Sequence, residues 1–504
     1  MTAPCLMVQG TASGVGKTLL TAALCRIFSR RGYRVAPFKA QNMALNAAVT
    51  ADGREIGRAQ AAQADAAGVE PTVDMNPILM KPEGDDRSQI VVRGVPLGRL
   101  TFEEYGAHRD ELLGVVAESL ARLRGAHDLV IIEGAGSPAE INLSAGDIVN
   151  MRIARLADAP VLLVGDIDRG GVFAAFVGTL ALLQPDDRAR VAGFVVNKFR
   201  GNLALLAPGL HTLHERTGVP VLGVVPYLER GLVPAEDSLD LDDTAPPPGD
   251  ERLAIVVVRP PRIANFDDLE PLAREPGVHV RFATSPSHLV GADLLIVPGS
   301  KSTMADLAWL RERGVADALI SAVRAGTPLI GLCGGYQMLG HALEDPDGVE
   351  SSVTVAPGLG LLPVTTTFVG TKRTVRVRGR VIADVGPLAA ARGQAIEGYE
   401  IHMGRTRVEG AAAPFGILDR GGVPCGDRDG ALAFDGAVVG TYVHGIFAND
   451  GLRRALLRWV AARKGVASDP RWGDGESATA RYDRLADAVA AALDLKTIAA
   501  LAGL

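Results

Sequence analysis

The sequence predicts an α/β protein with two doubly wound domains, and two observations support this. First, runs of Val, Ile and Leu alternate with helical patterns in both halves, as at 127–132 and 253–258, which is typical of parallel strands covered on both faces. Second, 504 residues exceed one ordinary core, and the acidic, proline-rich stretch LDLDDTAPPPGDER reads as a linker. We therefore expect domains at 1–242 and 251–504, joined by a linker at 243–250.

Composition narrows the possible functions. The net charge is −6 with acids and bases interspersed, so neither a nucleic-acid-binding face nor a polybasic membrane anchor is expected. The four cysteines lack the spacing of a disulfide framework or zinc site, which favours a reducing compartment. No window approaches the ~20 apolar residues of a membrane span, and no leader pattern opens the chain. We expect a soluble, cytoplasmic protein that acts on small molecules.

The first strand, in the apolar run that begins at Cys5, leads into GTASGVGKT at Gly10–Thr18 and then into a helix over Leu19–Ser29. Glycines let backbone N–H groups surround phosphate oxygens, while Lys17 reaches the outer phosphates and Thr18 offers a hydroxyl to Mg²⁺. The usual first glycine is replaced by Thr11, and the alternative is a simple glycine-rich turn. The expected ATP contacts in this loop are Thr11, Gly14, Val15, Gly16, Lys17 and Thr18.

Further polar groups follow other strands of the first half. Lys39 comes directly after the predicted strand 34–38, at the sheet edge where ligands gather in open α/β folds, so it could stabilise a transferring phosphoryl group. A solvated surface lysine is the alternative. Asn197 follows the strand 191–196 and resembles a base-reading asparagine, although a helix-capping asparagine is equally compatible with the sequence. Both are retained as nucleotide-site candidates.

Two carboxylates are candidate Mg²⁺ ligands. Glu133 ends the strand 127–132, and a carboxylate at a strand end opposite a P-loop is where this ion is usually held. Asp52 lies in a polar segment expected to line the same edge, as a direct or indirect ligand. Together with Thr18 they form the predicted metal site.

In the second half, a strand at 328–331 runs into Gly331-Leu332-Cys333-Gly334-Gly335. Glycines around a cysteine between strand and helix permit the sharp turn of a nucleophile elbow, and a helix N-terminus lowers a thiol's pKa. The alternative is a buried structural cysteine, which would not explain the glycines. We predict that Cys333 is a nucleophile.

A thiol nucleophile needs a base and an oxyanion site. The strand 437–443 ends at His444, which makes this residue the candidate base, with His402 as its rival. Backbone N–H groups of Gly334 and of the Gly299-Ser300 loop are expected to bind the oxyanion, because both loops leave strands at one sheet edge.

Other elements carry no predicted chemistry of their own. Val and Arg alternate over Thr374–Val381, which predicts a half-exposed strand. Apolar spacing predicts helices over Glu55–Ala67, Leu452–Lys464 and Tyr482–Leu495, the last two with a packing role only.

These motifs support a resemblance that covers nearly the whole chain. The second half resembles a class I glutamine amidotransferase domain, the first is similar to the dethiobiotin-synthetase type of P-loop ligase, and together they resemble the cobyric acid synthase family. The motifs are GTASGVGKT (10–18), PFKAQNMALN (37–46), DGREIGRAQ (52–60), EGAGS (133–137), DIDRGG (166–171), VNKFRG (196–201), GLCGGYQMLG (331–340) and GYEIHMG (398–404).

The resemblance implies an activity. Members amidate four peripheral carboxylates (b, d, e and g) of adenosylcobyrinic acid a,c-diamide in cobalamin biosynthesis, using ATP, Mg²⁺ and glutamine. Ammonia is released through a cysteine thioester, and the carboxylate is activated as an acyl phosphate. By this resemblance Lys17, Thr18 and Lys39 contact phosphate or metal, Asp52 and Glu133 are Mg²⁺ ligands, and Cys333 and His444 are the glutaminase pair.

One departure from the wider amidotransferase class concerns the base. That class places Pro-Glu directly after the histidine, whereas Gly445-Ile446 follows His444 here, so the third triad member is missing or supplied elsewhere. We therefore expect a slow glutaminase that needs an occupied ligase site. The rival interpretations are the related a,c-diamide synthase and a P-loop ATPase switch with an inactive amidotransferase-like module.

Overall fold

The computed structural model describes residues 2–84, 86–142, 146–229, 231–234 and 252–504, so the predicted linker at 243–250 lies outside the described residues. Contacts divide the chain into two compact units. The first comprises Met1–Ala44, Glu55–Pro234 and Glu476–Leu504, and the second comprises Leu45–Arg54 and Ala235–Gly475. Two segments therefore group differently from the predicted division, namely Leu45–Arg54 and Glu476–Leu504.

A six-stranded sheet forms the centre of the first unit. Its order is β12-β11-β10-β1-β9-β2, and all neighbours are parallel, as predicted. The central strands are buried along their whole length because helices cover both faces. The strands are β1 (Cys5–Gly10), β2 (Val35–Phe38), β9 (Leu129–Glu133), β10 (Val161–Asp166), β11 (Val191–Phe199) and β12 (Val221–Pro226).

The helix α1 (Lys17–Arg30) confirms the predicted helix after the loop. The predicted helix 55–67 begins later, because Glu55–Gly57 forms the short strand β5 before α2 (Arg58–Ala67). Further helices are α3 (Phe102–Ala107), α4 (Arg109–Ala126), α5 (Met151–Ala157), α6 (Val172–Leu182), α7 (Pro185–Arg188) and α8 (Leu203–Thr217). A four-stranded sheet consists of β3 (Gln41–Met43), β6 (Ile78–Pro82), β7 (Arg87–Val92) and β8 (Val95–Thr101).

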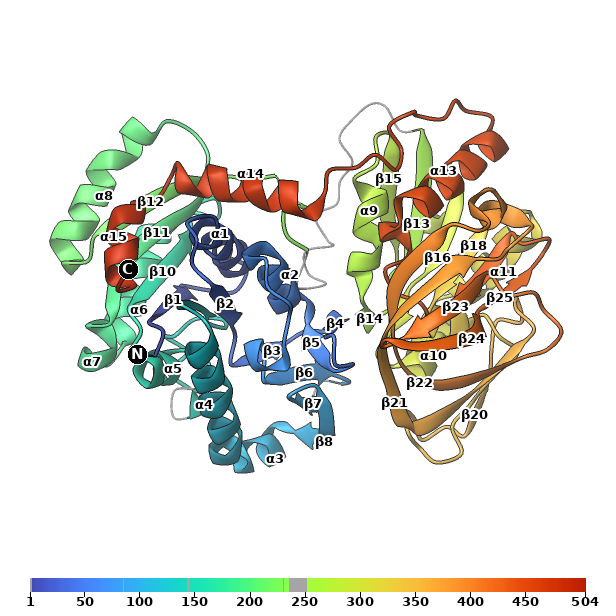
Figure 1. The fold of residues 1–504 in the computed structure, drawn as a ribbon, viewed down its shortest axis with the longest axis horizontal. Helices are drawn as coiled ribbons and strands as arrows, with labels where there is room; N and C mark the ends of the chain where they lie inside the picture. Colours follow the sequence, from blue (N-terminus) through green and yellow to red (C-terminus); the bar gives the residue numbers. More distant parts are fainter. Residues whose placement is uncertain (1, 85, 143–145, 230, 235–251) are drawn as a thin grey trace. The chain divides into compact units, whose positions relative to one another are not determined.

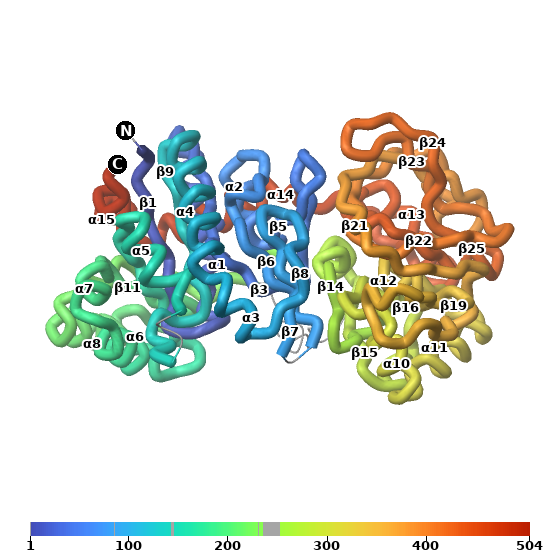
Figure 2. Tube along the Cα trace, turned by 90° about the horizontal axis from the view of Figure 1, so that it is seen from below, coloured from blue at the N-terminus to red at the C-terminus, as the bar shows by residue number. Residues whose placement is uncertain are grey.

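The C-terminal segment packs on the first unit, although the sequence analysis assigned it to the second domain. Figure 1 shows α14 (Ala478–Ala490) beside α1, where Tyr482 and Leu485 enter the core of the first unit and Arg26 forms an ion pair with Asp483. The predicted helix 482–495 is two helices, since the chain turns after α14 and Asp494 caps α15 (Leu495–Leu501). Both termini lie in the first unit (Figure 2).

The second unit also has a six-stranded sheet, in the order β15-β13-β16-β18-β26-β25. All neighbours are parallel except the edge pair β26 and β25, which confirms the second α/β sheet. The strands are β13 (Leu253–Val258), β15 (Val278–Ala283), β16 (Leu294–Val297), β18 (Leu329–Leu332), β25 (Ala431–Ala433) and β26 (Val438–Thr441). The helices are α9 (Glu270–Ala273), α10 (Thr303–Glu312), α11 (Val315–Arg324), α12 (Gly334–Met338) and α13 (Asp450–Lys464).

A second, mostly antiparallel sheet in this unit was not anticipated beyond its strand at 374–381. The long hairpin of β21 and β22 forms its centre, and the first sheet shares apolar cores with it. Its strands are β19 (Ala342–Glu344), β20 (Val355–Pro357), β21 (Val364–Val381), β22 (Ala395–Val408), β23 (Phe415–Arg420) and β24 (Val423–Asp429). Two short strands, β14 (Ile263–Ala264) and β17 (Gly299–Ser300), pair beside the first sheet, and β4 (Ala47–Val49) belongs to the segment Leu45–Arg54.

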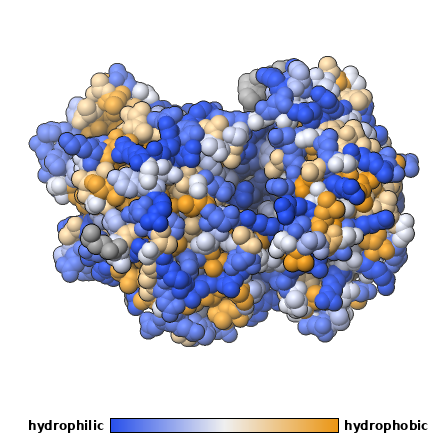
Figure 3. All heavy atoms as spheres, viewed as in Figure 1, coloured by the Kyte–Doolittle hydropathy of each residue, from blue (hydrophilic) through white to orange (hydrophobic). Residues whose placement is uncertain are grey.

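Surface polarity is unremarkable for a globular chain. On the face drawn in Figure 3 hydrophilic atoms predominate, and the apolar ones are scattered among them. No helix in the described part of the chain combines the length and apolarity needed to cross a bilayer.

Candidate active sites

The loop between β1 and α1 has the geometry of a phosphate-binding loop. Gly14 and Gly16 adopt φ values of 70° and 99°, which side chains strongly disfavour, and a Cβ on Gly16 would lie 2.1 Å from the amide nitrogen of Asn197. Lys17 Nζ donates to the carbonyls of Ala12 (3.0 Å) and Gly136 (3.1 Å). The lysine therefore lies along the loop that the sequence assigned to phosphate.

Two other predicted residues of the nucleotide site donate hydrogen bonds to Glu133. It ends β9, is 1% exposed, and accepts hydrogen bonds at Oε1 from Thr18 Oγ1 (2.9 Å) and Lys39 Nζ (3.0 Å). Gln63 Nε2 donates to its other oxygen at 2.5 Å. Lys39 is only 4% exposed, so the solvated-lysine alternative is wrong. Gln63 was missed, although polar residues among the alanines of α2 were a usable signal.

The chemistry of these groups fits Mg²⁺. A hydroxyl and a carboxylate are hard oxygen ligands, and this ion is commonly held by one or two carboxylates together with substrate phosphates and water. Within the described ranges no cluster of three or more His, Cys, Asp or Glu side chains could cage a metal alone. Thr18 and Glu133 are therefore suitable residues for a phosphate-associated ion.

Asp52 is not brought to this cluster. It belongs to the segment Leu45–Arg54 of the second unit, where it accepts a hydrogen bond from Thr50 Oγ1 (2.5 Å) and forms an ion pair with Arg54 (3.3 Å). Its side chain is 59% exposed. Its role as a metal ligand stays a prediction.

Asn197 and its neighbour support the phosphate-binding loop. Asn197 Nδ2 donates to the carbonyl of Val15 at 2.8 Å, and the side chain is nearly fully buried. Lys198 Nζ donates to the carbonyl of Gly14 (2.7 Å) and pairs with Asp166 (2.9 Å). The asparagine thus contacts the loop directly and does not act as the cap of a following helix.

Cys333 occupies a sharp turn between β18 and α12. Its φ of 49° and ψ of −107° are unusual for a residue with a side chain, as expected for a nucleophile elbow. The glycines are required by close packing, because a Cβ on Gly334 would lie 2.8 Å from the Ser300 nitrogen, and one on Gly335 would lie 2.0 Å from the Val297 carbonyl. The thiol is 8% exposed and lies 3.5 Å from the carbonyl of Ile401.

Asp268 supplies the third member of the triad from elsewhere in the chain, which is one of the two alternatives that the sequence left open, so the ground for expecting a slow glutaminase no longer holds. His444 Nδ1 lies 2.6 Å from Asp268 Oδ2, and the other oxygen of Asp268 accepts the Gly445 N–H at 2.7 Å. Burial lowers the pKa of His444, but the charges and hydrogen bonds of Asp268 and Cys333 outweigh it and raise this pKa to about 10. The sequence signal was the acidic pair Asp267-Asp268, which lies in a short 3-10 helix over Phe266–Leu269.

The predicted oxyanion groups also meet at the thiol. Gly299 and Ser300 form β17, and a Cβ on Gly299 would lie 3.3 Å from the ring of His444. The rival base, His402, donates from Nδ1 to the Gly404 carbonyl (2.9 Å) and stacks on Tyr442 with ring centroids 3.8 Å apart. The contacts of His444 with Cys333 and Asp268 favour His444 as the base.

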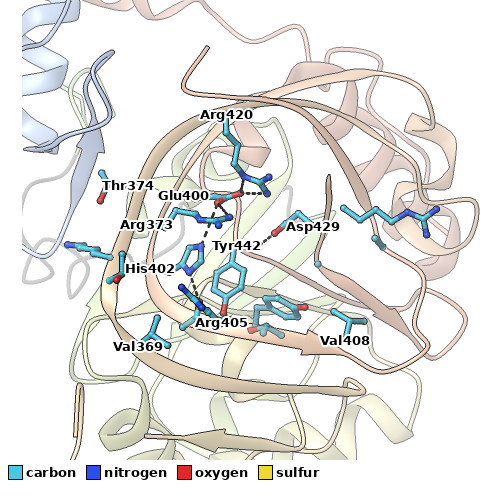
Figure 4. Close-up of a pocket in the computed structure, with 18 of the residues that line it drawn as sticks. Val369, Arg373, Thr374, Glu400, His402, Arg405, Val408, Arg420, Asp429 and Tyr442 are labelled. Carbon is cyan, nitrogen blue, oxygen red and sulfur yellow. Dashed lines mark hydrogen bonds and ion pairs between the residues drawn. The ribbon is translucent and has the colours of Figure 1, made fainter. Parts of the chain in front are cut away.

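A pocket of about 650 Å³ lies on the hairpin of β21 and β22 (Figure 4). Glu400, 1% exposed, pairs there with Arg420 at 3.1 Å and with His402 at 3.6 Å. Burial alone would raise the pKa of Glu400, but His402 and Arg420 lower it to about 2. Tyr442 lines the pocket and also accepts a hydrogen bond from Gln337 of α12, the helix that begins directly after Cys333. The pocket is charged and lies in the unit that carries the thiol.

Two domain families match this chain. Residues 6–237 match the CobQ/CobB/MinD/ParA nucleotide binding domain, and residues 254–452 match the CobB/CobQ-like glutamine amidotransferase domain. A P-loop unit joined to a thiol unit with a Cys-His-Asp set defines an enzyme of the glutamine-dependent amidoligase class.

Relatives over the full length identify the family within that class. Cobyric acid synthases from Sorangium cellulosum, Pelotomaculum thermopropionicum and Chloroflexus aurantiacus are 59%, 52% and 51% identical. The alignments cover 100%, 100% and 98% of this chain and 99%, 97% and 98% of those proteins. The chain belongs to the cobyric acid synthase family.

Proposed function

We propose that the protein amidates the b, d, e and g carboxylates of adenosylcobyrinic acid a,c-diamide, giving adenosylcobyric acid in cobalamin biosynthesis, with one ATP and one glutamine per amide. The family of its full-length relatives supports this substrate. The observation that carries the chemistry is the contact of His444 with Asp268 beside Cys333, in the same chain as the Glu133 cluster.

The second unit would release ammonia. The Cys333 thiolate attacks the side-chain amide carbon of glutamine, and backbone N–H groups of Gly334 and of the loop at Gly299 and Ser300 stabilise the oxyanion. His444, oriented by Asp268, gives its proton to the departing ammonia, which leaves a γ-glutamyl thioester. His444 then takes a proton from water as the water attacks the thioester, and glutamate is released.

The first unit would activate the carboxylate. The loop at Gly10–Thr18 would bind the ATP phosphates, and Thr18 and Glu133 would hold Mg²⁺, which would neutralise phosphate charge. Lys39, which donates to Glu133 Oε1, would stabilise the phosphoryl group in transfer. The substrate carboxylate takes this group to form an acyl phosphate, and attack by ammonia displaces phosphate to give the amide.

The test is to incubate the protein with ATP, Mg²⁺, glutamine and the a,c-diamide and to follow the corrinoid mass. We expect four successive small decreases, one for each carboxyl-to-amide conversion. An unchanged corrinoid mass accompanied by ATP hydrolysis would contradict the proposed substrate. Ammonium in place of glutamine is the control, because it tests the first unit without the thiol.

A further inference from the structure

Asp306 is a buried carboxylate that the proposed reaction does not use. It lies in the first turn of α10 and is 2% exposed. Its Oδ2 accepts the Ser300 hydroxyl at 2.6 Å, and its Oδ1 accepts the Arg262 N–H at 3.3 Å. Burial raises the pKa of Asp306 to about 6, although both donors lower it, so the carboxylate is ionised at pH 8 and can only accept. Both hydrogen bonds therefore depend on this one side chain.

The two donors come from the two strands of a short ladder beside the thiol. β14 and β17 pair antiparallel, with Ile263 opposite Ser300. The Lys301 N–H donates to the Arg262 carbonyl at 2.9 Å, which makes that neighbouring pair a hydrogen-bonded one. Because hydrogen-bonded and non-hydrogen-bonded pairs alternate in an antiparallel ladder, the pair of Ile263 and Ser300 is of the second kind. The ladder thus leaves the Ser300 N–H for another acceptor.

This N–H belongs to a residue in direct contact with the nucleophile elbow. A Cβ on Gly334 would lie 2.8 Å from the Ser300 nitrogen. Gly334 directly follows Cys333, and its own N–H is the other expected donor to the oxyanion. Donors of this kind act by being fixed before the charge develops. The proposed oxyanion site therefore depends on how firmly Ser300 is held.

The hydroxyl of Ser300 links its peptide to α10. The hydroxyl gives its proton to Asp306 and accepts the Ser302 N–H at 3.0 Å, which closes a turn at the start of the helix. Leu307 of α10 packs in the same apolar core as Cys333. The helix is therefore a fixed support, and Asp306 attaches both strands of the ladder to it.

We propose that Asp306 is a positioning residue for the oxyanion site, because it holds Ser300 and the opposing Arg262 peptide so that the Ser300 N–H stays beside Gly334. The inference rests on the proposed function, since an oxyanion forms only if Cys333 attacks glutamine. Asp306→Asn keeps the size of the side chain but offers one acceptor for two donors, so one of the two hydrogen bonds is lost. The Ser300 N–H then remains present but is held less firmly.

The test measures glutamate release by the full-length protein at pH 8 with ATP, Mg²⁺, glutamine and the a,c-diamide. Asp306→Asn should lower kcat about tenfold and leave KM within about twofold, because the oxyanion develops only after glutamine has bound. Complete loss of an oxyanion donor costs about a hundredfold or more, whereas here the donor is only displaced. Alkylation of Cys333 by iodoacetamide should keep its rate, since this displacement forms no oxyanion. Asp317→Asn, at an exposed carboxylate in the first turn of α11, is the matched control and should leave kcat unchanged.

Ser300→Ala tests whether Asp306 acts through the hydroxyl. This variant removes one of the two donors, so the amide oxygen of Asp306→Asn then has only the Arg262 N–H to accept. In the Ser300→Ala background, Asp306→Asn should therefore lower kcat by less than about threefold. A purely structural role, such as stabilising the N-terminus of α10, would instead give the same loss in both backgrounds.

Three outcomes would overturn the inference, namely a parent-like kcat in Asp306→Asn, equal losses in both backgrounds, and alkylation of Cys333 that slows in step with kcat. A parent protein that releases no glutamate would overturn the proposed glutaminase and this inference with it. Failure of the proposed substrate is distinguishable, because the corrinoid mass would stay unchanged while the parent protein still released glutamate. The comparison of Asp306→Asn with its parent would then remain decisive.

Discussion

The nucleotide site and the thiol site lie at strand ends of two similar parallel sheets, but their groups come from different kinds of structure. In the first unit, Lys39 follows β2 and Glu133 ends β9, while Thr18 and Gln63 lie on the helices α1 and α2, so each group belongs to or directly follows a regular strand or helix. In the second unit Cys333 and His444 follow strands, whereas Asp268 comes from a single turn of 3-10 helix over Phe266–Leu269. Groups at strand ends are brought together by the pairing of the strands, whereas a group on a short 3-10 helix outside the sheet is brought to the site by packing alone.

Substitution of Cys333 should have the largest effect and should separate the activities of the two sites. Cys333→Ala should reduce glutamine-dependent amidation by more than about ten thousandfold, because the covalent step has no other nucleophile. Ammonium-dependent amidation and ATP hydrolysis should survive, since Thr18 and Glu133 belong to the other unit. Cys425→Ala is the control, as this partly buried thiol lies on β24. Loss of both ammonia-dependent and glutamine-dependent activity would show that the two sites cannot be separated.

Substitution of Asp268 should have the next largest effect on glutamate release. Asp268→Asn should lower glutamate release by roughly a thousandfold, since His444 loses the group that orients it. The pKa of His444, about 10 in the parent protein, should fall, and the alkaline limb of the pH profile should move to lower pH. Asp267→Asn changes the neighbouring carboxylate as a control. A rate like that of the parent would mean that the triad is complete without Asp268.

Asp268→Asn should also change how the free energy of unfolding depends on pH. The folded protein raises the pKa of His444 from 6.5 to about 10, so the stability gained from this pair is fully present below pH 6.5 and is lost as the pH rises towards 10. The loss of unfolding free energy in Asp268→Asn should therefore be largest below pH 6.5 and shrink as the pH rises towards 10. Urea unfolding at several pH values measures it, and a pH-independent difference would contradict the assigned charge interaction.

Substitution of Glu133 should affect the nucleotide site of the first unit and leave the thiol site active. Glu133→Gln should reduce amidation with either ammonium or glutamine by about a hundredfold, since a neutral amide binds Mg²⁺ poorly, and added Mg²⁺ should restore part of the rate. Labelling of Cys333 by a glutamine-like electrophile should persist. Glu118→Gln, at an exposed residue of α4 paired with Arg93, is the control. A loss of labelling equal to the loss of amidation would contradict the separate assignment of the two sites.

Sequence reasoning succeeded where function follows local pattern. The loop at Gly10–Thr18, the strand before Cys333 and the strand before His444 all have the predicted form, because apolar runs and glycines determine them locally. Asp268 and Gln63 were missed because their partners are 176 and 70 residues away along the chain. The packing of α14 on the first unit was missed as well, because an amphipathic pattern shows which face of a helix is buried but not which domain buries it.

The smallest expected effect is on stability, and it concerns Asp429 in the antiparallel sheet of the second unit. Burial raises the pKa of Asp429 from 3.8 to about 7, although Thr441 and the N–H of Tyr442 donate to it. The unfolded carboxyl ionises above pH 3.8 while the folded one resists, so stability falls as the pH rises towards 7.

Asp429→Asn removes this charge and keeps an acceptor for the Tyr442 N–H, so it should raise the melting temperature by a few degrees, roughly 2–4 °C, at pH 8. The gain should shrink as the pH falls and vanish below pH 3.8, where the parent carboxyl is protonated in both states. Asp427→Asn on the same strand is the control, because its side chain is 59% exposed and its ion pair with Arg420 should contribute at most about 1 kcal/mol. If Asp429→Asn is less stable than the parent at pH 8, the ionised Asp429 carboxylate stabilises this edge of the second unit. Its two hydrogen-bond donors, Thr441 and the N–H of Tyr442, would then outweigh the cost of burying the charge.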